Sequence, residues 1–192
     1  MKDPIVQIGK PVLRQKATPV LQKDFGSKRI HALILKMSRV LSAEEYGVAI
    51  AAPQIGISER IFVIAGRAFI ADQKNKDDVE TPKDMAFINP EIIRLSRKKR
   101  EMSEGCLSVR GKYGTVTRHE RTSVRARDES GVVFTYHGTG LIAHIFQHEC
   151  DHLDGILYTD KALKLEDEAK RDELRAKHPA GSSRVLKDVD AA

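Results

Sequence analysis

The sequence of 192 residues has no tryptophan, only two cysteines and no long apolar run. The missing run excludes a membrane-spanning helix, which needs about 18 or more consecutive apolar residues. Two cysteines allow one disulfide at most, and the N-terminus lacks the apolar core of a secretion signal. We therefore predict a cytoplasmic protein with no membrane association, in which Cys106 and Cys150 are free thiols or metal ligands.

Aromatic residues are also scarce, at 5% of the chain, which leaves little for base stacking. The net charge of +6 permits contact with RNA, but a positive charge alone does not predict such contact. We expect no direct DNA binding, because no nucleic-acid motif is present. The length fits one domain. We predict a single catalytic domain over residues 1–165, followed by a charged C-terminal helix and loose tail over 166–192.

The hydrophobic pattern predicts a helix, several strands and then further helices. In chain order we expect an amphipathic helix (27–45), a buried strand (60–65), an exposed loop (71–84), two strands joined by an Asn-Pro turn (86–96), a β-hairpin within 112–134, a helix from the N-cap Thr139 to the αL residue Gly155, and a charged helix (161–177). This order indicates an α+β fold with a mainly antiparallel sheet.

The stretch QHECDHLDG, residues 147–155, contains His148 and His152 four residues apart with Glu149 beside the first. On a helix, residues four apart project from the same face and can bind one cation. Glu149 lies about 100° round the helix, where it can reach a water on that metal without being a ligand. Two ligands, an open position and a base are the requirements of metal-assisted hydrolysis. A pattern with three fixed positions also recurs by chance.

The third ligand distinguishes the candidate enzymes. One protease group needs a histidine three residues after Gly155, where this chain has Tyr158, so that interpretation fails. Another takes a downstream glutamate, and Glu173 lies in a charged run that is typical of a solvated face. Upstream, Cys106 in SEGCLSV offers a thiolate that suits zinc or ferrous iron. We interpret Cys150, which points about 200° away from His148, as a core residue.

Three motifs together give the sequence a family resemblance. GVAIAAPQ (47–54), EGCLS (104–108) and QHECDHLDG (147–155), in that chain order, resemble the motifs of peptide deformylase, and GKPVLRQKATPV near the start is similar to that family's N-terminal arm. The resemblance runs from about residue 5 to 161. It implies an α+β fold with antiparallel sheets around a central helix that carries H-E-x-x-H. It also implies a hydrolase that removes the formyl group from N-formylmethionine of newly made polypeptides.

The resemblance implies a role for each motif residue. Cys106, His148 and His152 would bind one divalent metal per chain, Fe²⁺ in the cell, with Zn²⁺, Ni²⁺ or Co²⁺ as alternatives. Glu149 would take a proton from the attacking water and pass it to the departing amine. The Gln54 amide and the Leu107 backbone N–H would stabilise the oxyanion. Outside this set, Glu104 and Arg118 match positions of a supporting ion pair beneath the ligands, and we favour that role over the alternative of a surface pair worth under about 1 kcal/mol.

Two positions depart from the family pattern in the expected substrate pocket. Its walls would be Val48, Ala49, Leu141, His144 and Ile145. The family usually has glycine at the position of Ala49, so a β-carbon there would crowd the substrate or require another backbone angle. His144 stands where an apolar residue is common. We expect it to change the preference for the first side chain of the substrate and to be a neighbour of the metal rather than a ligand.

The alternative function is a non-catalytic deformylase-like protein that keeps its metal as a structural element. The presence of all three ligands together with Glu149, Gln54 and Leu107 argues against it. The expected partners are N-formylmethionyl nascent polypeptides. Some family members use a C-terminal helix to dock on the ribosome, but the charges of residues 161–177 are balanced, so a solvated helix is an equal alternative. A third alternative, an RNA-binding protein, has no support in the sequence other than the net charge.

Overall fold

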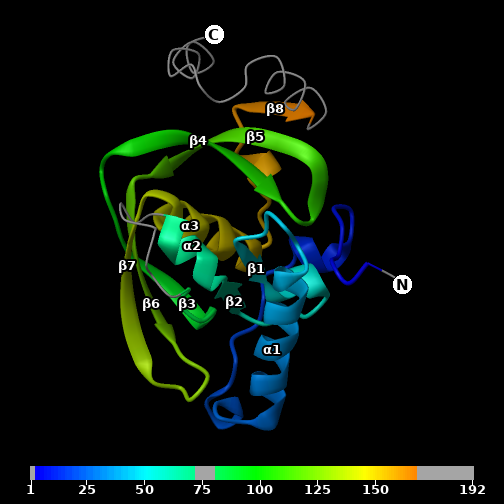
Figure 1. The fold of residues 1–192 in the computed structure, drawn as a ribbon, viewed down its shortest axis with the longest axis vertical. Coiled ribbons are helices and arrows are strands. Elements are labelled where there is room, and N and C mark those ends of the chain that lie inside the picture. The colour runs from blue at the N-terminus through cyan, green and yellow to red at the C-terminus, as the bar shows by residue number, and fades with distance from the viewer. Residues whose placement is uncertain (1–2, 72–80, 168–192) are drawn as a thin grey trace.

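Helix α3 (Gly140–Leu153) lies at the centre of the molecule and contacts strands of two β-sheets (Figure 1). The structure is a computed structural model, and it describes residues 3–71 and 81–167. The larger sheet has the strand order β1-β2-β3-β6-β7, and the smaller has the order β4-β5-β8. All of these neighbouring strands pair antiparallel. The predicted α+β fold with a central helix is confirmed.

The larger sheet consists of β1 (Ala49–Ala51), β2 (Ile61–Ile64), β3 (Met85–Leu95), β6 (Arg121–Arg127) and β7 (Val133–Thr139). The smaller sheet consists of β4 (Lys99–Cys106), β5 (Val109–His119) and β8 (Lys164–Asp167). The remaining helices are α1 (Lys28–Ser42), α2 (Gly66–Ala71) and the short 3₁₀ segments Pro11–Arg14, Gln22–Asp24, Ala52–Ile55 and Tyr158–Asp160. Among the described residues, no helix has the length and apolarity to cross a membrane.

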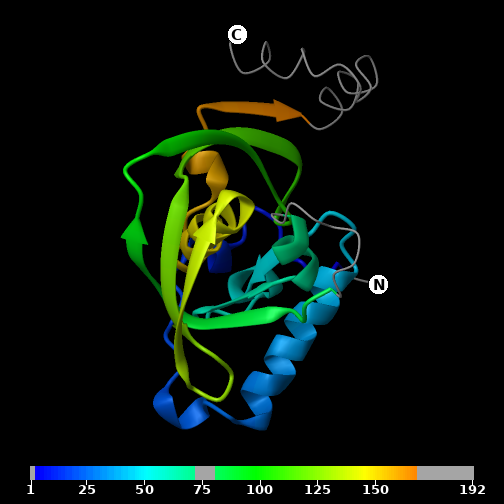
Figure 2. The ribbon, with the colours of Figure 1, turned by 60° about the vertical axis from the view of Figure 1, so that its left-hand side comes forward.

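Alternating side chains of β2 divide the apolar core into two clusters, because successive residues of a strand point to opposite faces. Phe62 and Ile64 belong to the cluster on the α3 side, whereas Ile61 and Val63 belong to the cluster that α1 covers. The edge of α1 that faces β1 and β2 is apolar, as the sequence pattern predicts, and its N-cap is Ser27. The larger sheet therefore lies between α3 and α1 at its β1–β2 end, and the start of α1 lies beside the β6–β7 turn, where His31 pairs with Glu129 (Figure 2).

Packing between α3 and the larger sheet is largely aromatic. Phe146 of α3 is fully buried, with its ring centroid 5.1 Å from Phe87, 5.7 Å from Tyr136 and 6.2 Å from Phe62. Edge-on aromatic pairs at these distances add to the free energy gained by burying the rings. Cys150, one turn further along α3, lies in the same cluster, as predicted. This flank holds the helix in place and carries no chemistry of its own.

The predicted Asn-Pro turn is wrong, because β3 runs without interruption from Met85 to Leu95. The backbone of β3 is irregular at Asn89, which has a φ of 50°. The register of β3 against β6 shifts just beyond Ile88. The Asn89 side chain accepts from Val20 N (2.8 Å) and donates to Val20 O (2.9 Å). A local shift in register with side-chain partners replaces the chain reversal that the sequence suggests.

Other predicted elements differ mainly at their ends. The hairpin is confirmed as β6 and β7 joined by residues 128–132, and Gly155 has the expected left-handed φ of 75°. The charged helix predicted over 161–177 is wrong where the structure describes it, because Lys164–Asp167 form β8. Pairing of β8 with the edge of β5 outweighs the helix propensity of those residues. Residues 168–192 and most of the loop predicted over 71–84 lie outside the described residues.

Candidate active site

Cys106, His148 and His152 form the one group of potential metal ligands that the described part of the chain brings together. Their ligand atoms lie within 4.8 Å of one another, and Cys106 Sγ is 3.2 Å from His152 Nε2. The two histidines share a face of α3, while Cys106 comes from the end of β4. The helix spacing and the smaller sheet therefore deliver three ligands to one point, as the sequence predicts. His144 is not in this group.

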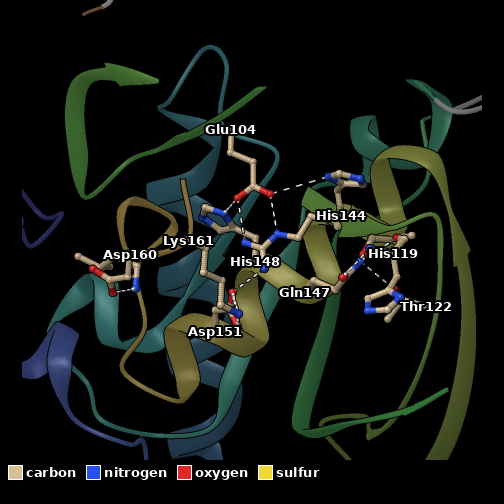
Figure 3. A network of polar contacts seen from close by, with 12 residues as sticks. Glu104, His119, Thr122, His144, Gln147, His148, Asp151, Asp160 and Lys161 are labelled. Atoms are coloured by element: carbon tan, nitrogen blue, oxygen red, sulfur yellow. Dashed lines mark hydrogen bonds and ion pairs between the residues drawn. The ribbon is translucent and has the colours of Figure 1, made fainter. Parts of the chain in front are cut away.

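The carboxylate of Glu104 holds His148 in place from behind. Glu104 Oε2 accepts from His148 Nδ1 at 2.9 Å, and Arg118 donates from Nε (2.7 Å) and Nη2 (2.9 Å) to the same carboxylate. Both members of the pair are buried, and Arg118 also donates to Asp151 Oδ2 at 2.5 Å. Figure 3 shows Glu104 between His148 and His144. A carboxylate that fixes a ligand imidazole in one orientation leaves its other nitrogen, Nε2, for a metal.

The electrostatics favour a thiolate at Cys106. Burial raises the pKa of its thiol, but the imidazoles of His152 and His148 outweigh burial and lower the pKa to about 5. Burial likewise raises the pKa of Glu104, yet the guanidinium of Arg118 and the two neighbouring imidazoles bring it well below its usual range. Cys150 shows the opposite result, because burial in the core raises its pKa to about 12. Only one of the two cysteines is prepared to act as an anionic ligand.

Glu149 lies next to the ligand group without joining it. Its side chain is buried, and its Oε2 has no hydrogen-bond partner among the described residues. Burial raises the pKa of its carboxyl group, and the neighbouring imidazoles only partly oppose that rise. A buried carboxylate with one free oxygen beside a metal site can accept a proton from a bound water. This geometry is the one that the H-E-x-x-H spacing predicts.

Gln54 and Leu107 approach the site from the other side. Gln54 is almost fully buried, and its Oε1 accepts from Ala51 N at 2.8 Å. That bond turns its amide toward the site, where Nε2 lies 3.3 Å from Ser108 Oγ and 3.4 Å from Cys106 Sγ. Leu107 lies in the tight turn between β4 and β5, directly after the ligand Cys106. Both residues line the same cleft as Glu149.

A cleft of about 560 Å³ opens onto Cys106 and His148 of the potential metal-binding group. All five residues predicted for the substrate pocket line it, namely Val48, Ala49, Leu141, His144 and Ile145. Ala49 lies in β1 and does not have a left-handed φ, so the alanine takes this position without backbone strain. His144 is 4% exposed, its nearest acidic oxygen is Glu104 Oε1 at 3.8 Å from Nδ1, and neither ring nitrogen has a hydrogen-bond partner among the described residues.

Two residues of the polar network were missed in the sequence. Asp151 receives Arg118 on one side and Lys161 Nζ at 2.7 Å on the other. It lies three positions after His148 on α3, so the helix spacing of the motif already places it on nearly the same face. Ser108, which contacts Gln54, lies in the tight turn after Cys106 and belongs to the EGCLS stretch itself. Both signals follow from motifs that were recognised for other residues.

The donor set fits a divalent transition metal. One thiolate and two imidazoles are the ligands that zinc and ferrous iron accept, and the three leave room for a fourth ligand toward the cleft. The buried carboxylate behind His148 supplies the outer hydrogen bond that is common at such centres. The residues present therefore suit a metal with an open position.

Comparison with known proteins agrees with this chemistry. A family model described as polypeptide deformylase matches residues 2–168. A peptide deformylase of Halothermothrix orenii is 39% identical over 164 residues, which are 85% of this chain and 96% of that protein. One from Heliobacterium modesticaldum is 41% identical over 157 residues, covering 82% and 91%. The Met-Ala-Ser-bound class I type b peptide deformylase of Acinetobacter baumannii superposes with a TM-score of 0.72 at 32% identity, covering 82% and 96%.

Proposed function

The chain belongs to the polypeptide deformylase family, and from that premise we propose that it hydrolyses the formyl group from N-formylmethionine of newly made polypeptides and releases formate. The observation that carries the proposal is the buried Glu149 beside the group formed by Cys106, His148 and His152, at the floor of an open cleft. The A. baumannii relative was solved with Met-Ala-Ser, a peptide of the kind that such a reaction would leave.

In the mechanism we propose, Cys106, His148 and His152 hold one divalent ion. That ion, when bound, supplies a Lewis acid that polarises the formyl carbonyl and acidifies the attacking water. Glu149 accepts a proton from this water as its oxygen adds to the formyl carbon. The Gln54 amide and the Leu107 N–H donate to the oxygen that becomes negative. Glu149 then delivers the proton to the departing nitrogen as the C–N bond breaks, and formate and a free amine result.

The surrounding residues make this proton transfer specific. Glu104 holds the ring of His148 through Nδ1, and Arg118 keeps that carboxylate charged. Within the described part of the chain, Glu149 has no competing partner on Oε2, so a water in the cleft is its available donor. We propose Fe²⁺ as the ion in the cell, with Zn²⁺, Ni²⁺ or Co²⁺ as substitutes, because the Cys-His-His set accepts each of them. Metal analysis of protein purified without oxygen tests this assignment.

The first test is formate release from formyl-Met-Ala-Ser by anaerobically purified protein with about one metal per chain. Replacing Glu149→Ala removes the proton acceptor and leaves all three ligands. We expect turnover to fall by about 10²–10⁴-fold while the bound metal is unchanged. An active Glu149→Ala variant would contradict the role of Glu149. A folded, metal-loaded wild type that releases no formate would instead favour the non-catalytic alternative.

We also propose that His144 sets the preference for the first side chain of the substrate. Its ring forms a polar part of a cleft wall whose other predicted members, Val48, Leu141 and Ile145, are apolar. The unpartnered ring nitrogens penalise a purely apolar occupant, since buried polar groups favour a hydrogen-bonding neighbour. We expect His144→Ile to raise the ratio of kcat/KM for formyl-Met over formyl-Gln peptides by about tenfold, as one hydrogen bond is worth about 1 kcal/mol or more. An unchanged ratio would show that His144 does not select the side chain.

Cellular partners and location form the last part of the proposal. The proposed substrate is made on ribosomes, and the two free thiols suit a reducing compartment, so we propose a cytoplasmic enzyme. Docking on the ribosome through the C-terminal segment stays a prediction, because residues 168–192 lie outside the described residues. Ribosome pelleting with and without that segment tests it.

A further inference from the structure

A second hollow, of about 730 Å³, lies on the side of the larger sheet that faces away from α3. Its cationic side chains are Arg94, Arg97, Lys98 and Arg121, with His137 beside them, and the hydroxyl groups of Ser96, Ser123 and Thr139 complete the polar lining. Of the residues that the structure describes, no aspartate or glutamate lines it. In contrast, the catalytic cleft has four glutamates in its lining, and the two hollows share no residue.

Strand pairing explains why these cations gather on one face. In β6 the alternate residues Thr122, Val124 and Ala126 are buried toward α3, so Arg121 and Ser123 project from the opposite face. The register then adds neighbours to that face, because Arg94 of β3 pairs with Ser123, and His137 and Thr139 of β7 pair with Ser123 and Arg121. The contacts of α1 with this sheet lie mainly on β1 and β2, and its start reaches the far β6–β7 turn through His31 and Glu129. The end of the face that carries Arg94 and Arg121 is exposed to solvent.

Most of the cationic side chains in the hollow have no acidic partner among the described residues. Within residues 3–71 and 81–167, no ion pair joins Arg94, Arg97 or Arg121 to an acidic side chain, and all three are exposed. Only Lys98 has a partner, Glu120 at 3.1 Å. The floor is ordered by Ser123 Oγ, which lies 2.8 Å from His137 Nδ1, and by Ser96 Oγ, which accepts from Arg121 N at 3.1 Å. Guanidinium and hydroxyl donors without a competing carboxylate are suited to phosphate oxygens.

We propose that this hollow binds the phosphodiester backbone of RNA. The cations are spread along an open face and continue into the exposed Lys99 and Arg100 of β4, so they suit a linear polyanion better than a single enclosed ion. No aromatic residue lines the hollow, which indicates contact with phosphates rather than stacking on bases. The choice of RNA rests on the proposed function, since a substrate made on ribosomes emerges beside ribosomal RNA. Bound there, the enzyme would keep its cleft, on the other side of the sheet, free for the nascent chain.

The experiment compares two variants of the full-length, metal-loaded protein with equal changes in charge. The test variant replaces three residues of the hollow, Arg94→Gln, Arg97→Gln and Arg121→Gln. The matched control replaces three exposed residues on and before α1 that have no ion pair among the described residues, Lys16→Gln, Lys36→Gln and Arg39→Gln. Binding is measured by fluorescence anisotropy to a labelled ribosomal RNA hairpin at several salt concentrations, and by co-sedimentation with phosphatidylglycerol vesicles.

We expect the test variant to bind RNA at least tenfold more weakly than the wild type, with the slope of log K against log salt reduced by about 2 to 3. The control should bind within about twofold of the wild type. Equal losses in both variants, no binding of RNA by the wild type, or binding to vesicles alone would each overturn the proposal. Formate release from formyl-Met-Ala-Ser should be unchanged in the test variant, so a failure here is distinguishable from a failure of the proposed deformylase activity.

Discussion

The two flanks of α3 differ in their contacts and in their structural roles. Toward the larger sheet, Phe146 and Cys150 pack into an apolar, largely aromatic cluster. Toward the smaller sheet, His148 and Asp151 meet the buried pair Glu104–Arg118. The apolar flank fixes where the helix lies, while the polar flank fixes how its ligand side chains are turned. Packing tolerates small changes of shape, but a buried charge without its partner is strongly destabilising.

The largest effect is expected when the polar flank is broken at Glu104. Glu104→Ala leaves Arg118 buried with only Asp151 as a partner and removes the acceptor of His148 Nδ1. We expect a loss of about 3–5 kcal/mol in the free energy of unfolding, because a buried charge then lacks its partner. We also expect metal to bind about 10–100-fold more weakly. Urea unfolding and competition with a chelator measure the two effects, and a variant with normal metal affinity would show that Glu104 does not orient His148.

A smaller and simpler effect is expected on the apolar flank. Phe146→Leu loses contacts with the rings of Phe87, Tyr136 and Phe62 and leaves the ligands in place. We expect the free energy of unfolding to fall by about 1–3 kcal/mol. Metal affinity of the folded protein should stay within about twofold of the wild type. If Phe146→Leu weakened metal binding as much as Glu104→Ala does, the two flanks would not have separate tasks.

The smallest effect is expected where a polar contact lies at the surface. Arg14 donates to Asp160, and this bond, with a lesser contribution from Leu157 N–H, lowers the pKa of the Asp160 carboxyl group. A lowered pKa means that the bond stabilises the fold at pH values above the unfolded pKa of about 3.9, and that this is lost as the pH falls through the folded value. Because both side chains are more than one third exposed, we expect Asp160→Asn to cost under about 1 kcal/mol at pH 7.

The measurement is urea unfolding of the wild type and Asp160→Asn at pH 7 and at about pH 2.5. The difference between the two proteins should shrink on acidification. A difference that grew as the pH fell would contradict this account of the bond.

The α+β fold class and the grouping of the two motif histidines could be predicted from the sequence, whereas some elements could not, and particular residues show why. His148, Glu149 and His152 lie within one helical turn of one another, so local spacing is enough to place them together. Cys106 lies 42 residues before His148, so local spacing cannot place it there, and thiolate chemistry together with the family resemblance indicates it as the third ligand. Asn89 and β8 could not be read locally, because the backbone of Val20 and the edge of β5 determine their conformations. Where hydrogen bonds to distant backbone atoms determine the conformation of a segment, local secondary-structure propensity predicts the wrong element.

The cationic hollow was unpredictable for a related reason. The sequence shows a net charge of +6 and the run RLSRKKR, but not which strand faces these residues share. Arg94 and Arg121 are 27 positions apart and meet only because β3 and β6 pair in one register. A shift of that register by one residue would turn Arg121 toward α3. These cationic residues therefore form one surface only once the sheet is formed.

Gly155, at the end of α3, has a consequence for the order in which the chain folds. A β-carbon at this position would lie 2.7 Å from the backbone of Arg14, and Ala17 N donates to Leu153 O at 2.8 Å. The N-terminal arm therefore rests on the last turn of the helix that carries both histidine ligands. During synthesis the N-terminal arm leaves the ribosome before α3 does. The backbone that the arm contacts, at Leu153 and Gly155, is therefore not yet present. The arm, which is made before α3, must therefore wait for α3 to be made before it can pack, and the helix with both histidines gains this support only after residue 155 has been added.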